Sequence, residues 1–277
     1  MIALVRLRDE IAIDAKYRGV SKIGADKELL LSQRQFLSDP TKKVAFKEGF
    51  WTIAKKQLKK ESFGKCAYCE ANTHVAAHGD VEHYRPKSVY WWLAYTYDNY
   101  LYACQICNQT YKSDNFPIGA AAKFASPKVL ATHSDLIIQN LSGKISPDPV
   151  DIQTNFTLEQ YLKAHKKEKP FLLNPYFDDP TQYFAYEFDD TLEEVKIVAN
   201  KVAHKKYVDA SEKFYGINRI ELKNVRYSIF SKFRAFKMAY TQLPEGPVKK
   251  EVKKQIDDML SGKYLFAGMN RYFDAKF

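Results

Sequence analysis

The sequence has no long apolar run, few glycines and prolines, and only four cysteines. No apolar stretch approaches the roughly 18–20 residues that a transmembrane helix needs. With 11 glycines and 11 prolines among 277 residues, a collagen-like or low-complexity chain is excluded. The opening residues, MIALVRLRDE, become charged after five positions and lack the apolar core of a signal peptide. We therefore expect a soluble, cytoplasmic protein that binds no membrane.

Basic side chains are in excess, with 43 Lys and Arg against 33 Asp and Glu, which gives a net charge of +10. Such a balance favours a polyanionic partner, most often nucleic acid. The excess is uneven: residues 1–60 carry 14 basic and 7 acidic side chains, whereas residues 61–120 carry 4 and 6. A locally acidic centre between basic flanks suits a metal site that handles an anionic substrate.

Aromatic residues make up 14% of the chain, chiefly 19 Tyr and 18 Phe. A ring-rich core is the simplest reading, and stacking of a few rings on bases is the alternative. Composition does not choose between them.

The pattern along the chain predicts an α+β protein that is mostly α-helical. Residues 1–60 form a basic helical region, with one helix capped by Asp26 and ended at Ser38, and another over 50–58. Residues 61–120 change to short strands and turns, and 121–277 return mostly to helix around two strands at 183–188 and 193–199. Four lysines line the other side of the second of the two N-terminal helices, as a solvated face or as phosphate contacts: Lys55, Lys56, Lys59 and Lys60.

All four cysteines fall in two C-x-x-C pairs, Cys66 with Cys69 and Cys104 with Cys107. A two-residue spacing lets both thiolates bind one ion, and two such pairs complete a tetrahedral Cys₄ zinc site. Disulfides are disfavoured in a reducing compartment, and a redox pair does not explain two motifs. We expect structural zinc.

The residues between and after the pairs indicate more than a zinc ribbon. Glu82 directly precedes His83 at the end of a short apolar strand, and a proline turn follows. Asn99 stands five residues before the second pair, and Asn108 follows its last cysteine with Lys112 four residues on, which places both on one helix face.

This pattern, C-x-x-C, E-H-x-x-P, N-x-x-x-x-C-x-x-C-N-x-x-x-K, resembles the HNH (ββα-metal) endonuclease motif. The likeness covers residues 66–116 and implies two strands and a helix around one divalent cation, often braced by a Cys₄ zinc. More loosely, KCAYCE, GDVEHYRPKS, LLNPYFDDP and FYGINRIELKNVR resemble the PtuB-type nuclease subunits of Septu and retron-linked anti-phage defence systems. That resemblance implies an ATPase partner.

The chemistry of the residues agrees with this resemblance. Phosphodiester hydrolysis needs an activated water, and His83 is the candidate general base because a neutral imidazole accepts a proton near neutral pH. The resemblance gives Asn99 the task of bracing the loop that orients His83, and makes Glu82 and Asn108 the ligands of the catalytic cation.

The sequence departs from the family pattern at two places. Glu82 stands where many members have Asp, and Lys112 stands where some have a second His. An oxygen-only ligand set favours Mg²⁺ or Mn²⁺. Lys112 is then expected to face a phosphate, together with Arg85 and Lys87.

Other polar residues carry weaker signals. His74 and His78 are read as loop residues, and Asp80 either supports the metal or caps a turn. The remaining histidines have no recognisable partners: His133, His165 and His204.

Together these features predict a metal-dependent endonuclease that cuts DNA, with structural Zn²⁺ and catalytic Mg²⁺ or Mn²⁺. The competing hypothesis is a non-catalytic zinc module that binds nucleic acid or protein. RNA is a further substrate that the same chemistry permits. Neither flank has a base-reading motif, so a partner is expected to supply any sequence specificity.

Overall fold

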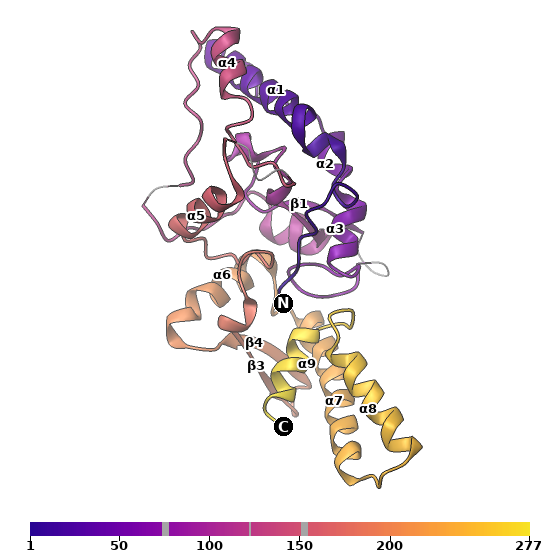
Figure 1. Ribbon diagram of the computed structural model, residues 1–277. Helices are drawn as coiled ribbons and strands as arrows, with labels where there is room; N and C mark the ends of the chain where they lie inside the picture. The colour runs from indigo at the N-terminus through magenta and orange to yellow at the C-terminus, as the bar shows by residue number, and fades with distance from the viewer. Residues whose placement is uncertain (74–77, 122, 151–154) are drawn as a thin grey trace.

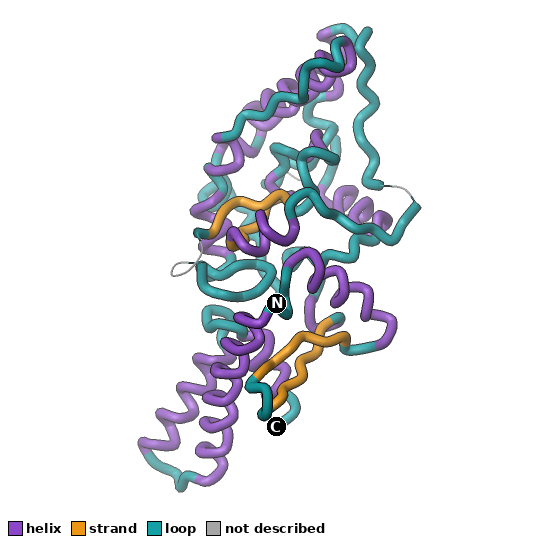
Figure 2. The backbone as a smooth tube through the Cα atoms, turned by 180° about the vertical axis from the view of Figure 1, so that it is seen from behind, coloured by secondary structure: helices purple, strands orange, loops and turns teal. Residues whose placement is uncertain are grey.

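The computed structural model describes residues 1–73, 78–121, 123–150 and 155–277. Helices dominate these residues, and their strands form two antiparallel hairpins, so the protein is a mostly helical α+β fold as predicted. Figure 2 shows one pair of strands in each half of the molecule. In Figure 1, helices α1 and α4 lie at one end and the hairpin of α7 and α8 extends from the other. No helix of the described residues is long and apolar enough to cross a bilayer.

The N-terminal region contains the short helix η1 (Ala15–Tyr17) and helices α1 (Gly19–Ser38), α2 (Gly49–Thr52) and α3 (Lys55–Glu61). Helix α1 ends at Ser38 as predicted, but it begins seven residues before Asp26. The predicted cap was therefore wrong. Asp26 lies buried inside the helix because its carboxylate pairs with Lys22 Nζ at 2.6 Å, one helical turn away. The helix expected over 50–58 is divided into α2 and α3.

The cysteine-bearing region builds the first hairpin, from β1 (Gly79–His83) and β2 (Tyr100–Cys104). His83 pairs with Tyr100 and Gly79 with Cys104. The loop between the strands holds the 3₁₀ helices η2 (Trp91–Leu93) and η3 (Tyr97–Asn99), and the π-helix η4 (Ile106–Lys112) follows β2. Two short strands and a helix thus come in the predicted ββα order.

Both faces of this hairpin are covered, and β2 is buried along its whole length. Side chains alternate along a strand, so Tyr100 and Tyr102 pack toward the N-terminal helices while Leu101 and Ala103 join the main core. The hairpin is therefore held between the N-terminal and C-terminal parts of the chain.

Helices α4 (Asp135–Leu141) and α5 (Leu158–Glu168) follow, and Thr157 and Gln160 form a capping box at the start of α5. The second hairpin, β3 (Phe184–Asp189) with β4 (Glu194–Ala199), confirms the predicted strands. The remaining elements are η5 (Pro180–Gln182), η6 (Val202–His204), α6 (Lys205–Tyr215), α7 (Ile220–Gln242), α8 (Pro247–Leu260) and α9 (Ala267–Asp274).

The main core joins this C-terminal part to the cysteine pairs. Phe230 of α7 is fully buried, and its ring centroid lies 4.7 Å from that of Phe188 in β3 and 4.3 Å from that of Phe273 in α9. Aromatic burial of this kind is a major part of the stability of a core.

We predict that Phe230→Ala lowers the free energy of unfolding by about 3–5 kcal/mol, because it opens a cavity where β3, α7 and α9 meet. Urea denaturation of both proteins measures the change. Met238→Ala on the same helix is the control, since Met238 is 57% exposed and its loss is expected to cost less than about 0.5 kcal/mol. Equal effects of the two substitutions would contradict this packing.

Candidate active site and metal centre

The two C-x-x-C pairs converge on one buried point. The sulfur atoms of all four cysteines lie within 4.8 Å of one another: Cys66, Cys69, Cys104 and Cys107. A zinc ion bound at about 2.3 Å from each sulfur holds the sulfurs roughly 3.8 Å apart, so the cluster fits Zn²⁺ with little adjustment. Burial raises the pKa of the Cys66 thiol, so a bound cation is needed to keep this buried thiol ionised. The cluster is consistent with the predicted structural zinc.

Arg219, at the start of α7, is the charged neighbour of this cluster. Its Nη1 lies 3.5 Å from the Cys107 sulfur, and its Nη2 lies 4.0 Å from the Cys69 sulfur. A Cys₄ zinc centre carries a net charge of −2, which a guanidinium offsets. No spacing pattern points to this contact, because Arg219 lies more than 100 residues beyond the cysteine pairs.

A polar groove with a volume of about 300 Å³ lies beside β1 and η4. Residues from three segments line it: Trp51 from α2; Val81, Glu82, His83, Pro86 and Lys87 from β1 and the loop after it; and Asn108, Gln109, Ser113 and Asp114 from η4 and the turn after it. The groove brings together the predicted general base, both predicted oxygen ligands and one predicted phosphate contact.

His83 is held in one orientation. Its Nε2 lies 2.9 Å from the Ala94 carbonyl oxygen, which only accepts hydrogen bonds, so Nε2 carries the proton. The ring packs edge-to-face against Trp51 and Tyr100, at centroid distances of 4.9 and 5.1 Å. Burial lowers the pKa of His83 to about 3, so the imidazole is neutral at pH 7. Nδ1 is then the unprotonated nitrogen that can accept a proton.

Asn99, the last residue of η3, braces the start of the loop after β1. Its Oδ1 accepts from the Arg85 backbone N–H at 2.8 Å, and its Nδ2 donates to the Arg85 and Leu93 carbonyl oxygens at 3.0 and 3.3 Å. Asn99 is fully buried. It closes both ends of the loop that carries Ala94, the partner of His83.

Glu82, which lines the groove, forms a buried ion pair with Lys112, which does not line it. Lys112 Nζ lies 2.5 Å from Glu82 Oε1 and donates to the His83 carbonyl oxygen at 3.0 Å. Burial raises the pKa of Glu82, although the Lys112 ammonium lowers it. The positive charge that the sequence places in this helix therefore faces inward and balances the carboxylate.

The donor atoms at the groove suit a hard divalent cation. Glu82 supplies a carboxylate, and the Asn108 side chain makes no hydrogen bond to any residue that the structure describes. Oxygen donors beside open space are what Mg²⁺ and Mn²⁺ use, with water filling the remaining positions. Asp114 adds a second, exposed carboxylate to the lining. Sequence reasoning passed over it, since it falls just outside the motif.

The three cations expected to face phosphate take different positions. Lys87 is half-buried at the edge of the groove, with its Nζ 5.1 Å from the centre of the Trp51 ring. Arg85 and Lys112 are fully buried and do not meet that expectation. The physical reason is that each has a buried carboxylate partner: Arg85 pairs with Glu168 at 2.7 Å, and Lys112 with Glu82.

The weaker candidates lie elsewhere. Asp80 does not line the groove, and its carboxylate lies 3.6 Å from Lys55 Nζ. His78 is an exposed loop residue as predicted, whereas His74 lies outside the described residues. His165 has partners that its sequence context did not reveal, since its Nδ1 lies 3.1 Å from Arg85 Nη2.

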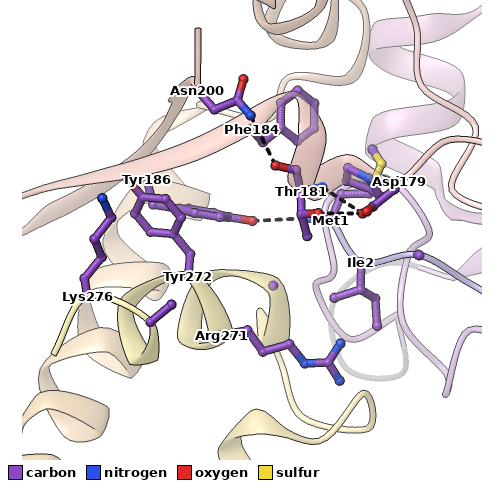
Figure 3. Close-up of a pocket in the computed structure, with 14 residues that line it drawn as sticks. Met1, Ile2, Asp179, Thr181, Phe184, Tyr186, Asn200, Arg271, Tyr272 and Lys276 are labelled. Carbon is purple, nitrogen blue, oxygen red and sulfur yellow. Dashed lines mark hydrogen bonds between the residues drawn. The ribbon is translucent and has the colours of Figure 1, made fainter.

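A larger cavity of about 500 Å³ lies along the first residues of the chain, between them and β3 and α9 (Figure 3). The buried Met1 ammonium pairs there with Glu70 at 2.5 Å and contacts the Tyr186 hydroxyl. Asp179 is the carboxylate in its lining, and Thr181 and Gln182 already donate to it. No histidine is among the described residues that line it, and the Asp179 carboxylate is already engaged by these hydrogen bonds, so the groove at His83 is the better candidate active site.

We predict that Arg219→Gln weakens zinc binding 10- to 100-fold, because the thiolates lose a charged hydrogen-bond donor. Competition with a chromophoric chelator measures the affinity. Lys213→Gln, an exposed change in neighbouring α6, is the control and is expected to leave it unchanged. Wild-type affinity in the Arg219 variant would show that the guanidinium does not stabilise the centre.

No family model matches the chain, and no solved structure matches it. The chain is 27% identical over 233 residues to the Septu protein PtuB of Bacillus mycoides (strain KBAB4). The match covers 75% of this chain and 64% of the relative, so the chain spans less than two thirds of that protein's length. The predicted likeness to PtuB-type proteins is thus confirmed as a distant homology to PtuB.

Proposed function

We propose that this protein is a metal-dependent HNH endonuclease that hydrolyses phosphodiester bonds of DNA. The observation that carries the proposal is the groove itself. It sets a neutral histidine, fixed in one tautomer, beside two oxygen donors at the junction of two strands and a helix. A module that only binds nucleic acid has no need for this combination.

In the proposed reaction, His83 Nδ1 accepts the proton of the attacking water. The Ala94 carbonyl fixes the ring from the opposite nitrogen, and Trp51 and Tyr100 keep it from rotating. Glu82 and Asn108 would hold a divalent cation, which would stabilise the charge of the transition state and the departing 3′ oxygen. Products with a 5′-phosphate and a 3′-hydroxyl are expected.

Lys87 supports the assignment of a polyanionic substrate, because its ammonium stands at the edge of the groove without a carboxylate partner in the described residues. Phosphate contacts of this kind contribute to affinity for DNA but do not distinguish one base sequence from another. The net charge of +10 acts in the same direction. We therefore propose binding to the DNA backbone with little sequence preference by this chain alone.

Homology to PtuB and the resemblance to Septu-type nuclease subunits support a second part of the proposal. The protein acts in anti-phage defence as the nuclease of a complex with an ATPase subunit. Control of the nuclease by that subunit would protect the DNA of the cell.

We predict that His83→Ala abolishes nicking of plasmid DNA in Mn²⁺, because it removes the neutral imidazole whose Nδ1 takes the proton from the attacking water. The measurement compares the wild type, His83→Ala and His133→Ala, with EDTA as the metal-free arm. His133 does not line the groove, so its loss is expected to leave the rate unchanged. Zinc content, about one ion per chain, serves as the check that each protein is folded.

Nicking by His83→Ala at the wild-type rate would refute the assignment. If no variant cuts plasmid, single-stranded DNA or RNA even with the ATPase subunit added, the zinc-stabilised binding module becomes the better explanation. Cleavage of RNA alone would keep the chemistry and change the substrate.

We predict that Lys87→Ala weakens DNA binding at every sequence and reduces the salt slope of log K by about one unit, since one phosphate contact is lost. Binding is measured on a short duplex over a salt series. Lys205→Ala, on an exposed part of α6, is the matched control with an unchanged slope. An unaltered slope for Lys87→Ala would place the DNA elsewhere.

A further inference from the structure

The loop between β1 and β2, residues 84–99, decides where the His83 ring lies. It provides the Ala94 carbonyl that accepts from His83 Nε2 at 2.9 Å and from the Tyr100 hydroxyl at 2.7 Å. Asn99 clamps its two ends. These contacts reach the backbone of Arg85, Leu93 and Ala94, and the side chains of Arg85 and Tyr90 have other partners.

The side chains of Arg85 and Tyr90 are both bound by a carboxylate from a distant segment of the chain. Glu168, the last residue of α5, is 1% exposed, and each of its oxygens has two donors. Oε2 accepts from Arg85 Nε at 2.8 Å and lies 2.7 Å from Arg85 Nη2. Oε1 accepts from the Tyr90 hydroxyl at 2.6 Å and from the Phe124 backbone N–H at 2.8 Å.

The carboxylate therefore grips the loop at two points, Arg85 at its start and Tyr90 in its middle. The Arg85 guanidinium also donates to the Tyr161 hydroxyl at 3.2 Å and contacts His165 Nδ1, both on α5. The Arg85 backbone is the same one that Asn99 clamps. Buried groups connect Glu168 to His83 without a break.

We propose that Glu168 is a positioning residue for the nuclease, which acts through Arg85 and Tyr90 to hold the Ala94 carbonyl against His83. The inference rests on the proposed function and extends it to α5, a segment outside the HNH motif. Glu168 touches neither the groove nor the reacting atoms. Its effect is on the orientation and tautomer of the imidazole.

The alternative is that Glu168 only stabilises the fold. A buried carboxylate with a charged partner is costly to disturb wherever it lies. Asp26 gives the matched control, because it is equally buried and pairs with Lys22 at 2.6 Å. Its carboxylate also accepts from the Gly143 backbone N–H, and none of its hydrogen bonds reaches residues 84–99.

The experiment compares wild type, Glu168→Gln and Asp26→Asn, with Tyr90→Phe as a milder variant that removes one hydrogen bond and keeps the ring. Single-turnover cleavage at saturating DNA is measured well below each melting temperature. Glu168→Gln is expected to be roughly 10- to 100-fold slower, as for a displaced catalytic group, and Tyr90→Phe to fall between it and wild type. Asp26→Asn is expected to lose melting temperature but keep its rate within about twofold.

A second readout does not depend on cleavage. Protein with ¹⁵N-labelled histidine reports the tautomer of each ring, and His83→Ala identifies the signal of His83. Wild type and Asp26→Asn are expected to show one Nε2–H tautomer, and Glu168→Gln a mixture or a shifted signal.

The two readouts separate the failure of each proposal. Wild-type tautomer and rate in Glu168→Gln would overturn the positioning role. If the wild type does not cut even with the ATPase subunit added, the proposed function fails, and the tautomer alone still decides whether Glu168 positions His83.

Discussion

The constraint on which the structure depends is the meeting of four sulfur atoms at one buried point. A hairpin of two five-residue strands is marginally stable by itself. Here Cys104 at the end of β2 and Cys107 in η4 meet the loop that carries Cys66 and Cys69. A zinc ion bound at this point would crosslink the hairpin, the helix and that loop, and so fix the orientation of the helix that carries Asn108 relative to the hairpin that carries His83. The four cysteines also belong to the main core, so the segments that line the groove are packed, through the cysteines, against the C-terminal helices.

Buried charge is the second organising feature. Two cations of the motif, Arg85 and Lys112, face inward to Glu168 and Glu82. Removing such charges from water is expensive, and each pair is stable only because further hydrogen bonds satisfy the remaining donors. The buried pair restricts the backbone, because the Arg85 guanidinium has several fixed acceptors and leaves the loop between β1 and β2 little conformational freedom.

Sequence spacing identified the features whose residues lie close together along the chain. The cysteine pairs, the two hairpins and the Glu82–His83 pair follow from short-range patterns. Glu168 and Arg219 could not be found in this way, because they reach the site from 83 and 112 residues beyond their partners. Asp26 was misread since a helix cap and a buried ion pair use the same residue type, and only the position of Lys22 one turn earlier separates them.

The same contacts bear on where the proposed nuclease unit ends. By sequence, residues 61–120 form the module, but a wall of its groove is Trp51 of α2, and the support of its loop is Glu168 of α5. Arg219, the residue just before α7, contacts the cysteines. A polypeptide limited to 61–120 would keep every residue of the HNH motif and lose all three. The motif therefore contains the candidate reacting groups, while segments on both sides of it supply the contacts that hold those groups in place.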